Sequence, residues 1–292
     1  MREPPVSTTL IALLALAAVA AGIAAWRVMI VAPGDVQLTM HEVPIPGLPR
    51  AFDGYRLALL TDFHHGPQQP ASRARRAVAY ANAQSPHLAI LLGDYGTSEW
   101  WARSVWRHWY RRTFRILGPV LSTLRARDGT VAVIGNHDYY ASADETCAWL
   151  ESLGARVLRN DAITLPSPDG PLRIVGLDDL EEGDLDTERV SMLVAGATPT
   201  IVLSHHPDGV RLCGHPSVRL VLAGHTHGGQ VVLPWVGAMV TRSRICTRTQ
   251  PAGWVTNSFA PLFVSRGLGS QVPVRIGSTP EVAIITLRVA AE

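Results

Sequence analysis

The sequence predicts an α/β fold in which two β-sheets pack together between helices, after an apolar N-terminal segment. In the first half, short apolar runs typical of buried strands alternate with helix-like segments. In the second half, short strands dominate and helical patterns become rare. Alternation followed by a strand-rich region fits packed sheets that are flanked by helices. The 292-residue chain is 47% hydrophobic, which is enough for a core of that size.

Residues 1–32 are predicted to be a membrane anchor or a signal segment. No charged residue lies between Pro4 and Trp26, and a helix that crosses a bilayer needs about 20 apolar residues. The apolar part of a secretory signal is shorter, about 7–15 residues, although small residues such as Ala25 would permit cleavage. On length we favour an uncleaved single-pass anchor. Arg2 and Arg27 flank the segment almost symmetrically, with a slight preference for an extracytoplasmic main domain.

The prolines of residues 33–50 predict a linker with one edge strand at 36–43, and residues 51–292 are predicted to form the main domain. Expected strands lie at 55–61, 87–92, 130–134, 172–177, 200–203, 219–222, 230–233, 261–264 and 281–287. Expected helices lie at 71–83, 116–126, 143–153 and 187–195. Gly154 ends the third of these helices, because glycine is common just after a helix C-terminus.

The composition excludes several classes of chemistry. All 26 basic residues are arginine, so no lysine can form a Schiff base. The net charge of +2 gives no reason to expect a nucleic-acid polymer as a partner. The three cysteines, Cys147, Cys213 and Cys246, are odd in number and far apart, so they form neither a disulfide framework nor a Cys-x-x-Cys metal site.

Polar motifs follow five of the apolar runs, at the point where each predicted strand ends. They supply seven candidate metal ligands: Asp62, His64, Asp94, Asn136, His205, His225 and His227. Open α/β sheets bind their ligands beyond the carboxyl ends of their strands. We therefore expect these side chains to converge on one edge of a sheet.

Asp62-x-His64 and Gly93-Asp94 are weak motifs on their own, since a strand-end Asp is commonly a cap and Gly-Asp is a common turn. The run Gly135-Asn136-His137-Asp138 is stronger, because an unpaired polar group inside a sheet costs roughly 2–7 kcal/mol. Five such motifs together favour a two-metal hydrolytic centre. Mixed carboxylate, amide and imidazole ligands suit Mn, Fe, Zn or Co.

The order Asp-x-His, Gly-Asp, Gly-Asn-His-Asp, His, Gly-His-x-His resembles that of the calcineurin-like metallophosphoesterases, from residue 55 to about 287. The tail LFVSRGLGSQVPVRIG is similar to a bacterial membrane- or envelope-associated branch of that family. The resemblance implies a four-layer α/β/β/α sandwich with two divalent metal ions. Asp62, His64, Asp94 and His227 would bind the first ion, and Asp94 would bridge to a second held by Asn136, His205 and His225. His137 would be the catalytic histidine, held by a neighbour such as Asp138, and His206 has no assigned role.

The implied reaction is phosphoester hydrolysis by a metal-bridging hydroxide, with His137 protonating or stabilising the leaving oxygen. A membrane-anchored phosphodiesterase or pyrophosphatase is the main hypothesis, and the resemblance to the envelope branch allows a nucleotide-linked lipid as its substrate. The alternatives are a phosphomonoesterase of the same fold and a non-catalytic metal-binding interaction module. The protein phosphatases of the superfamily carry Asp-Arg-Gly after the Gly-Asp motif, whereas this chain has Tyr95-Gly96-Thr97, which disfavours a phosphoprotein substrate.

Residues 95–115 are a candidate lid or membrane-contact insertion. Arg103, Arg107, Arg111 and Arg115 share one helical face, and Trp100, Trp101, Trp106, Trp109 and Tyr110 lie among them. The alternative is a helix that packs its aromatic side chains on the core.

Two further features allow a functional and a structural interpretation. Arg266 is a candidate phosphate contact or half of a structural ion pair. The acidic run from Asp178 to Glu188 is expected to be a solvated loop without a metal.

Overall fold

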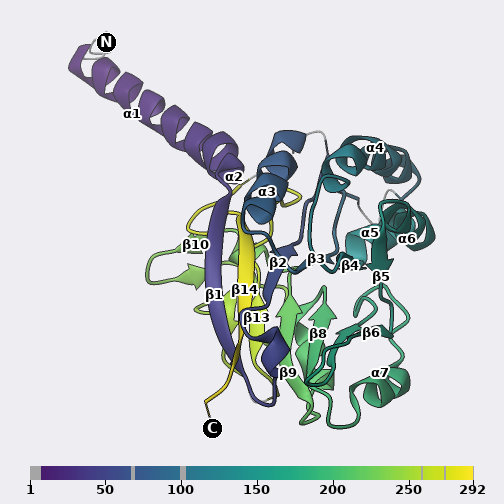
Figure 1. The fold of residues 1–292 in the computed structure, drawn as a ribbon. Coiled ribbons are helices and arrows are strands. Elements are labelled where there is room, and N and C mark those ends of the chain that lie inside the picture. Colours follow the sequence, from purple (N-terminus) through teal and green to yellow (C-terminus); the bar gives the residue numbers. More distant parts are fainter. Residues whose placement is uncertain (1–7, 67–69, 99–102, 258, 273, 292) are drawn as a thin grey trace.

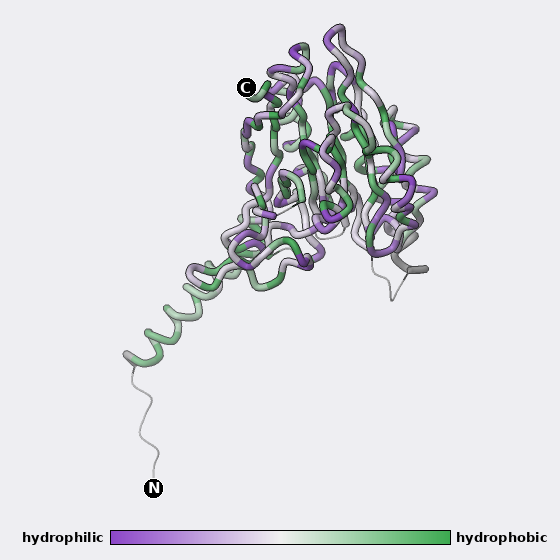
Figure 2. The backbone as a smooth tube through the Cα atoms, turned by 90° about the horizontal axis from the view of Figure 1, so that it is seen from below, coloured by the Kyte–Doolittle hydropathy of each residue, from purple (hydrophilic) through white to green (hydrophobic). Residues whose placement is uncertain are grey.

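The computed structural model describes residues 8–66, 70–98, 103–257, 259–272 and 274–291. Helix α1 (Thr8–Trp26) continues through η1 (Arg27–Val31) and the short α2 (Ala32–Gly34). It projects from the rest of the molecule and is apolar along its length (Figures 1 and 2). Residues Leu10–Gly34 are the only described segment that is long and apolar enough to cross a membrane, a criterion that N-terminal signal sequences also meet.

The first sheet has six strands in the order β1-β14-β2-β3-β4-β5. Their bounds are β1 Gln37–Ile45, β14 Glu281–Val289, β2 Arg56–Leu60, β3 Leu88–Leu92, β4 Thr130–Val133 and β5 Ala155–Val157. β2, β3, β4 and β5 are parallel to one another, while β14 runs antiparallel to β2. β1 pairs with β14 along its full length, so the segment expected to be a linker contributes the edge strand of this sheet.

The second sheet also has six strands, in the order β12-β13-β9-β8-β7-β6. Their bounds are β12 Gly253–Val255, β13 Leu262–Val264, β9 Val218–Ala223, β8 Thr200–Ser204, β7 Leu172–Gly176 and β6 Asp161–Leu165. Its four central strands are parallel, and β6 and β12 close the sheet as antiparallel edges. A separate hairpin joins β10 (Val232–Leu233) to β11 (Gly237–Ala238).

Helices cover the outer faces of both sheets, which gives the expected four-layer α/β/β/α sandwich (Figure 1). The helices on the first sheet are α3 (Ala71–Ala83), α4 (Arg103–Leu121), α5 (Asn136–Ala141) and α6 (Ala143–Ser152). The second sheet is covered by α7 (Thr187–Val194) and by the 3₁₀ turn η4 (Pro207–Leu212). The expected α/β class is confirmed.

The strands of the first sheet are apolar on both faces because both faces are covered. In β2, Leu57 and Leu59 pack into the core between the two sheets, whereas Ala58 and Leu60 pack under the helices. Alternate residues of β2 therefore point to two different buried environments, the space between the sheets and the space under the helices, and not to core and solvent in turn. This explains why the sequence shows continuous apolar runs.

One helix differs from its predicted bounds. The sequence indicated a helix at 116–126, but α4 begins at Arg103 and ends at Leu121. The tryptophan-arginine stretch is therefore part of a long helix from Arg103 onward. Trp100 and Trp101 lie outside the described residues, and the side chains of Arg103, Trp106 and Arg107 are not described.

The core between the sheets should carry a large share of the stability. Leu222 of β9 is fully buried there, so Leu222→Ala should lower the free energy of unfolding by about 2–5 kcal/mol. Met192, which is 65% exposed on α7, provides the control, and Met192→Ala should change it by less than about 0.5 kcal/mol. Chemical denaturation of the full chain in detergent measures both, and equal losses would contradict the assignment of this core.

Candidate metal centre

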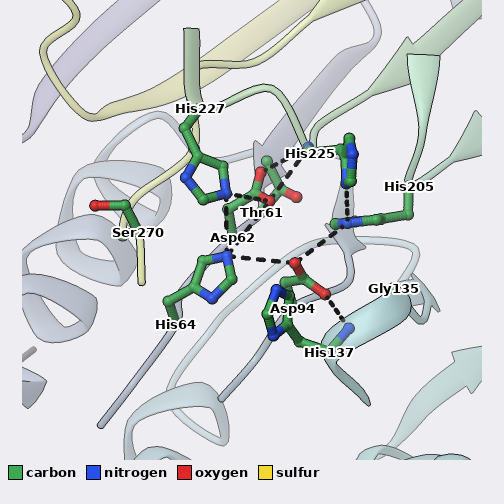
Figure 3. Close-up of polar contacts among 12 residues, drawn as sticks. Thr61, Asp62, His64, Asp94, Gly135, His137, His205, His225, His227 and Ser270 are labelled. Carbon is green, nitrogen blue, oxygen red and sulfur yellow. Dashed lines mark hydrogen bonds and ion pairs between the residues drawn. The ribbon is translucent and has the colours of Figure 1, made fainter. Parts of the chain in front are cut away.

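The five polar motifs meet at one end of the sandwich, but they come from two sheets. Asp62, Asp94 and Asn136 follow β2, β3 and β4 of the first sheet. His205 and His225 follow β8 and β9 of the second. The expectation that all ligands lie on one edge of a single sheet is therefore wrong. Instead, the carboxyl ends of both sets of parallel strands face a common space (Figure 3).

Four predicted ligands form a compact cluster. Donor atoms of Asp62, His64, Asp94 and His227 all lie within 4.8 Å of one another. The Nε2 atom of His64 is 3.3 Å from Asp94 Oδ2 and 3.0 Å from His227 Nε2. His227 Nε2 is in turn 3.5 Å from Asp62 Oδ1. This is the set that the family resemblance implies for the first metal ion.

Asp94 links this cluster to a second one. The same oxygen, Oδ2, lies 3.3 Å from His205 Nε2, and His205 Nε2 lies 3.3 Å from His225 Nδ1. Asn136 is buried nearby, and its Oδ1 atom has no hydrogen-bond partner. One carboxylate oxygen thus faces imidazoles of both clusters, as a bridging ligand would.

Five of the seven candidate ligands adopt left-handed backbone conformations. Their φ angles are 53° for Asp62, 42° for His64, 56° for Asp94, 69° for His225 and 52° for His227. Asp and His tolerate this region better than most residues, but it still costs of order 1–3 kcal/mol each. Strained residues of this kind cluster at functional sites, because the surrounding fold holds them there. The sharp turns aim consecutive side chains into the same space.

Two glycines let the ligand loops approach each other. A Cβ atom at Gly135 would lie 2.5 Å from Asp94 Oδ1, and one at Gly224 would lie 2.7 Å from Asp62 Oδ2. Neither carboxylate could stay in place beside a larger residue. The glycines that precede the Asn-His-Asp and His-x-His motifs are therefore required by close packing.

The charge state of the cluster favours cation binding. Burial alone would raise the pKa of Asp94, but the imidazoles of His205 and His137 hold it well below its usual range. Burial likewise opposes ionisation of Asp62, whose pKa is lowered by His227. Burial lowers the pKa of His64, which favours the neutral form of this ring. Ionised carboxylates beside a neutral imidazole are the protonation states that a divalent metal requires.

The candidate catalytic histidine, His137, lies at the start of α5. Its backbone N–H donates to Asp94 Oδ1 at 3.0 Å, and its ring contacts the His64 ring edge to face. The Nδ1 atom of His137 contacts the backbone carbonyl oxygen of Ser98. The hydroxyl of Ser98 in turn donates to the backbone carbonyl of His137. The first of these contacts places the ring proton on Nδ1 and leaves Nε2 as the nitrogen suited to proton transfer.

Asp138 was expected to hold His137, but the contact at Nδ1 is made by Ser98. Asp138 instead accepts backbone N–H bonds from Asp94 at 2.9 Å and from Gly135 at 2.7 Å. It also accepts the hydroxyl of Tyr110, which is buried. Burial, together with the charge of Asp94, raises the pKa of Asp138 to about 7. Asp138 therefore fixes the ends of β3 and β4, which position the ligands.

The position of Tyr110 distinguishes in part between the two interpretations of residues 95–115, a lid or membrane contact and a helix packed on the core. Its side chain packs inside the domain, and the hydroxyl of Thr113 donates to the carbonyl of His65. This face of α4 belongs to the interior, as the packing alternative proposed. Trp109 is 38% exposed, with Arg112 above its ring. The role of this segment as a lid stays a prediction.

Sequence reasoning missed two residues near the centre. Glu181 comes from the acidic run that was expected to be solvated, yet its Oε1 lies 3.5 Å from His206 Nε2 and 4.0 Å from His225 Nε2. Asp178 and Asp179 of the same run are buried, which corrects the expectation of a solvated loop. Arg242 lines the small cavity formed by Asp94, His137 and His225. Neither residue has a neighbouring motif that could have indicated its position.

Arg266 does not line that cavity. Its guanidinium pairs with Glu281 at 2.9 Å, and its backbone N–H donates to the same carboxylate. The structural ion pair, which was one of the two interpretations of Arg266, is therefore the one that forms. Glu281 begins β14, so the pair ties this loop to the first sheet.

The donor set fits a pair of divalent ions. The buried atoms without a hydrogen-bond partner include Asn136 Oδ1, a potential metal ligand. Asp62 and Asp94 are buried carboxylates close together, an arrangement that is unfavourable unless cations balance the charge. Oxygen and nitrogen donors without thiolates match Mn, Fe, Zn or Co. Residues Asp62 to His227 thus offer the ligands of two sites that share Asp94.

Comparison with known proteins places this geometry in a family. The family model described as calcineurin-like phosphoesterase matches residues 55–229. The chain belongs to the calcineurin-like phosphoesterase family. It is accordingly a metal-dependent phosphoester hydrolase, and the family prediction is confirmed. The matched range contains all seven candidate ligands and His137.

Relatives cover most of the chain. The uncharacterized metallophosphoesterase YkuE of Bacillus subtilis is 28% identical, over 88% of this chain and 87% of its own. Phosphodiesterase YaeI of Escherichia coli is 29% identical, over 80% of this chain and 82% of its own. A transmembrane protein with metallophosphoesterase domain from Danio rerio is 29% identical over 85% of this chain, which spans 56% of that protein.

Among solved structures, a dimetal phosphatase from Danio rerio aligns with a TM-score of 0.50. It is 14% identical, over 74% of this chain and 88% of its own. At this identity the likeness concerns the fold alone. It agrees with the four-layer sandwich described above.

Metal analysis of variants should separate the two clusters. Purified protein should hold two ions per chain. His64→Ala should lose the first, Asn136→Ala should lose or weaken the second, and Asp94→Asn should reduce both, because Asp94 Oδ2 faces both clusters. Elemental analysis by mass spectrometry measures the ions. His215→Ala, a change at a half-buried histidine bonded to Ser217, is the control and should keep both. Loss of both ions in His64→Ala and also in Asn136→Ala would argue against two separate sites.

Proposed function

We propose that this protein is a membrane-anchored phosphodiesterase with two divalent metal ions, and that it hydrolyses a phosphodiester or diphosphate linkage in an amphiphilic substrate. The observation that carries the proposal is the position of Asp94 Oδ2, 3.3 Å from His64 on one side and 3.3 Å from His205 on the other. It supports two adjacent metal sites. Ions held by these residues would activate water and neutralise the charge that develops on a phosphoryl group.

Hydrolysis joins a water oxygen to phosphorus and breaks the bond to the leaving oxygen, which then needs a proton. His137 is the residue placed to supply it. The carbonyl of Ser98 fixes its Nδ1, so the ring presents Nε2 for the proton transfer. Nε2 gives a proton only in the doubly protonated imidazolium form, and the proton that the attacking water loses can restore that form. The His137 N–H bond to Asp94 Oδ1 couples the position of this ring to that of the central carboxylate.

A larger cavity beside the metal centre supports a diester over a small monoester. It has a volume of about 740 Å³ and is lined by Leu180, Glu181, Leu185, His206, Asp208, Arg211, Leu212, Arg242, Ser243 and Arg244. Arg242 also lines the small cavity at the ligands, so the two spaces are neighbours. Arginines suit a second anionic group, and the leucines suit an apolar part. The relative YaeI is named a phosphodiesterase.

Membrane anchoring by residues 10–34 remains part of the proposal. The segment satisfies the length and composition of a span, and a Danio rerio relative is named a transmembrane protein. We propose a single-pass N-terminal anchor with the catalytic domain outside the cytoplasm. A nucleotide-linked lipid is a substrate that would use the arginines, the leucines and the membrane together. A phosphomonoesterase of the same fold is the alternative.

Replacement of His137 tests catalysis. His137→Ala should leave both metal ions bound and lower the rate constant kcat for a chromogenic phosphodiester about 10²–10⁴-fold, the usual contribution of a general acid. Kinetics and metal content are measured on the same preparation. His215→Ala serves again as the control, with an expected change of less than twofold in kcat. An undiminished rate with His137→Ala would refute its role, and turnover of phosphomonoesters but not of diesters by metal-loaded wild-type protein would favour the phosphomonoesterase.

Replacement of Arg242 tests the larger cavity. Arg242→Gln should raise KM for a diester with a second phosphate about tenfold or more, because one charge-assisted hydrogen bond contributes about 1.5–3 kcal/mol. The same variant should have little effect on kcat/KM for a small chromogenic diester. Arg219→Gln, on a strand away from that cavity, is the control for a lost arginine. Equal effects of Arg242→Gln on both substrates would contradict a role in recognising the second group.

A further inference from the structure

The hairpin of residues 231–240 carries an unusual row of exposed apolar side chains. Trp235 at its tip is fully exposed, and Val236, Met239 and Val240 are 48%, 53% and 61% exposed. Single exposed apolar residues are normal on a protein surface, but a contiguous group marks an interaction site. The group occupies the turn between β10 and β11 and the residues that follow β11.

The base of the hairpin is held firmly although its tip is exposed. Ala238 is buried, and its N–H donates to Arg248 O at 2.7 Å. The N–H of Met239 donates to Val231 O at 2.9 Å. A Cβ atom at Gly229 would lie 2.4 Å from Ala238 Cβ, so the hairpin packs closely on the turn that contains His227. The exposed side chains are thus presented by a defined structure.

The hairpin lies beside the end of the candidate membrane span. Val231 pairs with Ile276, and the N–H of the adjacent Arg275 donates to the carbonyl of Val28 in η1. Met29 and Ile30 of η1 are exposed apolar residues as well. The apolar surface therefore continues from the helix to the hairpin through one intervening loop. A lipid bilayer that accepts the helix would lie next to the hairpin.

The charge around the hairpin suits a membrane surface. From Val231 to Pro280 the sequence contains five arginines and no Asp or Glu. Arg242, Arg244 and Arg248 are exposed, while Arg266 is paired with Glu281 and Arg275 is buried. Exposed arginines beside an aromatic and aliphatic group are the pattern of segments that lie in the interface of anionic membranes.

We propose that the hairpin of residues 231–240 inserts its apolar tip into the lipid bilayer beside the N-terminal helix. The proposal rests on the membrane anchoring in the proposed function. Val240 and Arg242 line the same small cavity as Asp94, His137 and His225, so the inserted hairpin would form one wall of the route from the lipid surface to the metal centre. The substrate class that this favours is a membrane lipid with a phosphodiester or diphosphate headgroup.

Depth-dependent fluorescence quenching tests the insertion. The full chain is reconstituted into vesicles of phosphatidylglycerol and phosphatidylcholine with brominated acyl chains, which quench tryptophans that enter the bilayer. Trp235→Phe keeps an apolar tip but removes this fluorophore, so the quenching should be clearly lower than in wild-type protein, whose other tryptophans the variant retains. Trp149→Phe, at a side chain packed on Phe114, is the matched control and should leave the quenching unchanged. Identical quenching in wild type and Trp235→Phe would overturn the proposal.

Activity measurements separate this proposal from the proposed function. The double variant Trp235→Ser and Val236→Ser should hydrolyse a vesicle-embedded phosphodiester lipid several-fold more slowly, with unchanged turnover of a soluble chromogenic diester. Equal turnover of the lipid by variant and wild type would overturn the role of the hairpin in access while leaving the hydrolase intact. If wild-type protein hydrolyses neither substrate, the proposed function fails, and the quenching experiment still decides the insertion.

Discussion

Two buried carboxylates, Asp62 and Asp94, impose the constraint on which the rest of the centre depends. Charged groups in a protein interior are unfavourable unless opposite charges and hydrogen bonds surround them. Backbone N–H groups of His225 and His137 meet part of this requirement by donating to Asp62 and Asp94. Burial lowers the pKa of His64, whereas Asp94 raises the pKa of His205 against the effect of burial, so the imidazoles balance the negative charge only in part. A pair of divalent cations is what this arrangement of groups can hold at low cost.

The same constraint explains the strained loops. Each ligand must turn sharply out of a strand to reach a common point, and the left-handed conformations of Asp62, Asp94 and His225 achieve this in one residue. Asp138 holds two of the loops through their backbone N–H groups. The packing of the apolar cores keeps these residues in their strained conformations. The free energy of metal coordination can offset that strain. Stability and metal affinity are therefore linked in this fold.

The candidate ligands could be selected from the sequence because each belongs to a motif that begins just after an apolar strand. A polar residue at that position cannot continue the sheet interior, and the pattern is visible without knowledge of the fold. The division of the strands between two sheets is not visible, since it depends on pairings between segments far apart, such as β13 with β9. Tyr110, Glu181 and Arg242 reach the centre from a helix and two loops. Their positions follow from tertiary packing alone, which no local pattern encodes.

Strand direction also decides how the centre is placed relative to the N-terminal helix. β1 starts just after that helix and runs parallel to β14, which is antiparallel to β2. The start of β1 therefore lies at the same end of the sheet as the carboxyl end of β2, where Asp62 follows. The N–H of Gln37 donates to the carbonyl oxygen of Pro280, and the N–H of the next residue, Glu281, donates to that of Gly267. Gly267 in turn packs against Asp62, because a Cβ atom at Gly267 would lie in contact with the Asp62 side chain. If the helix spans a bilayer, this short chain of contacts holds the metal centre at the membrane-facing end. A soluble substrate gains nothing from that placement, whereas a lipid headgroup has only a short distance to travel.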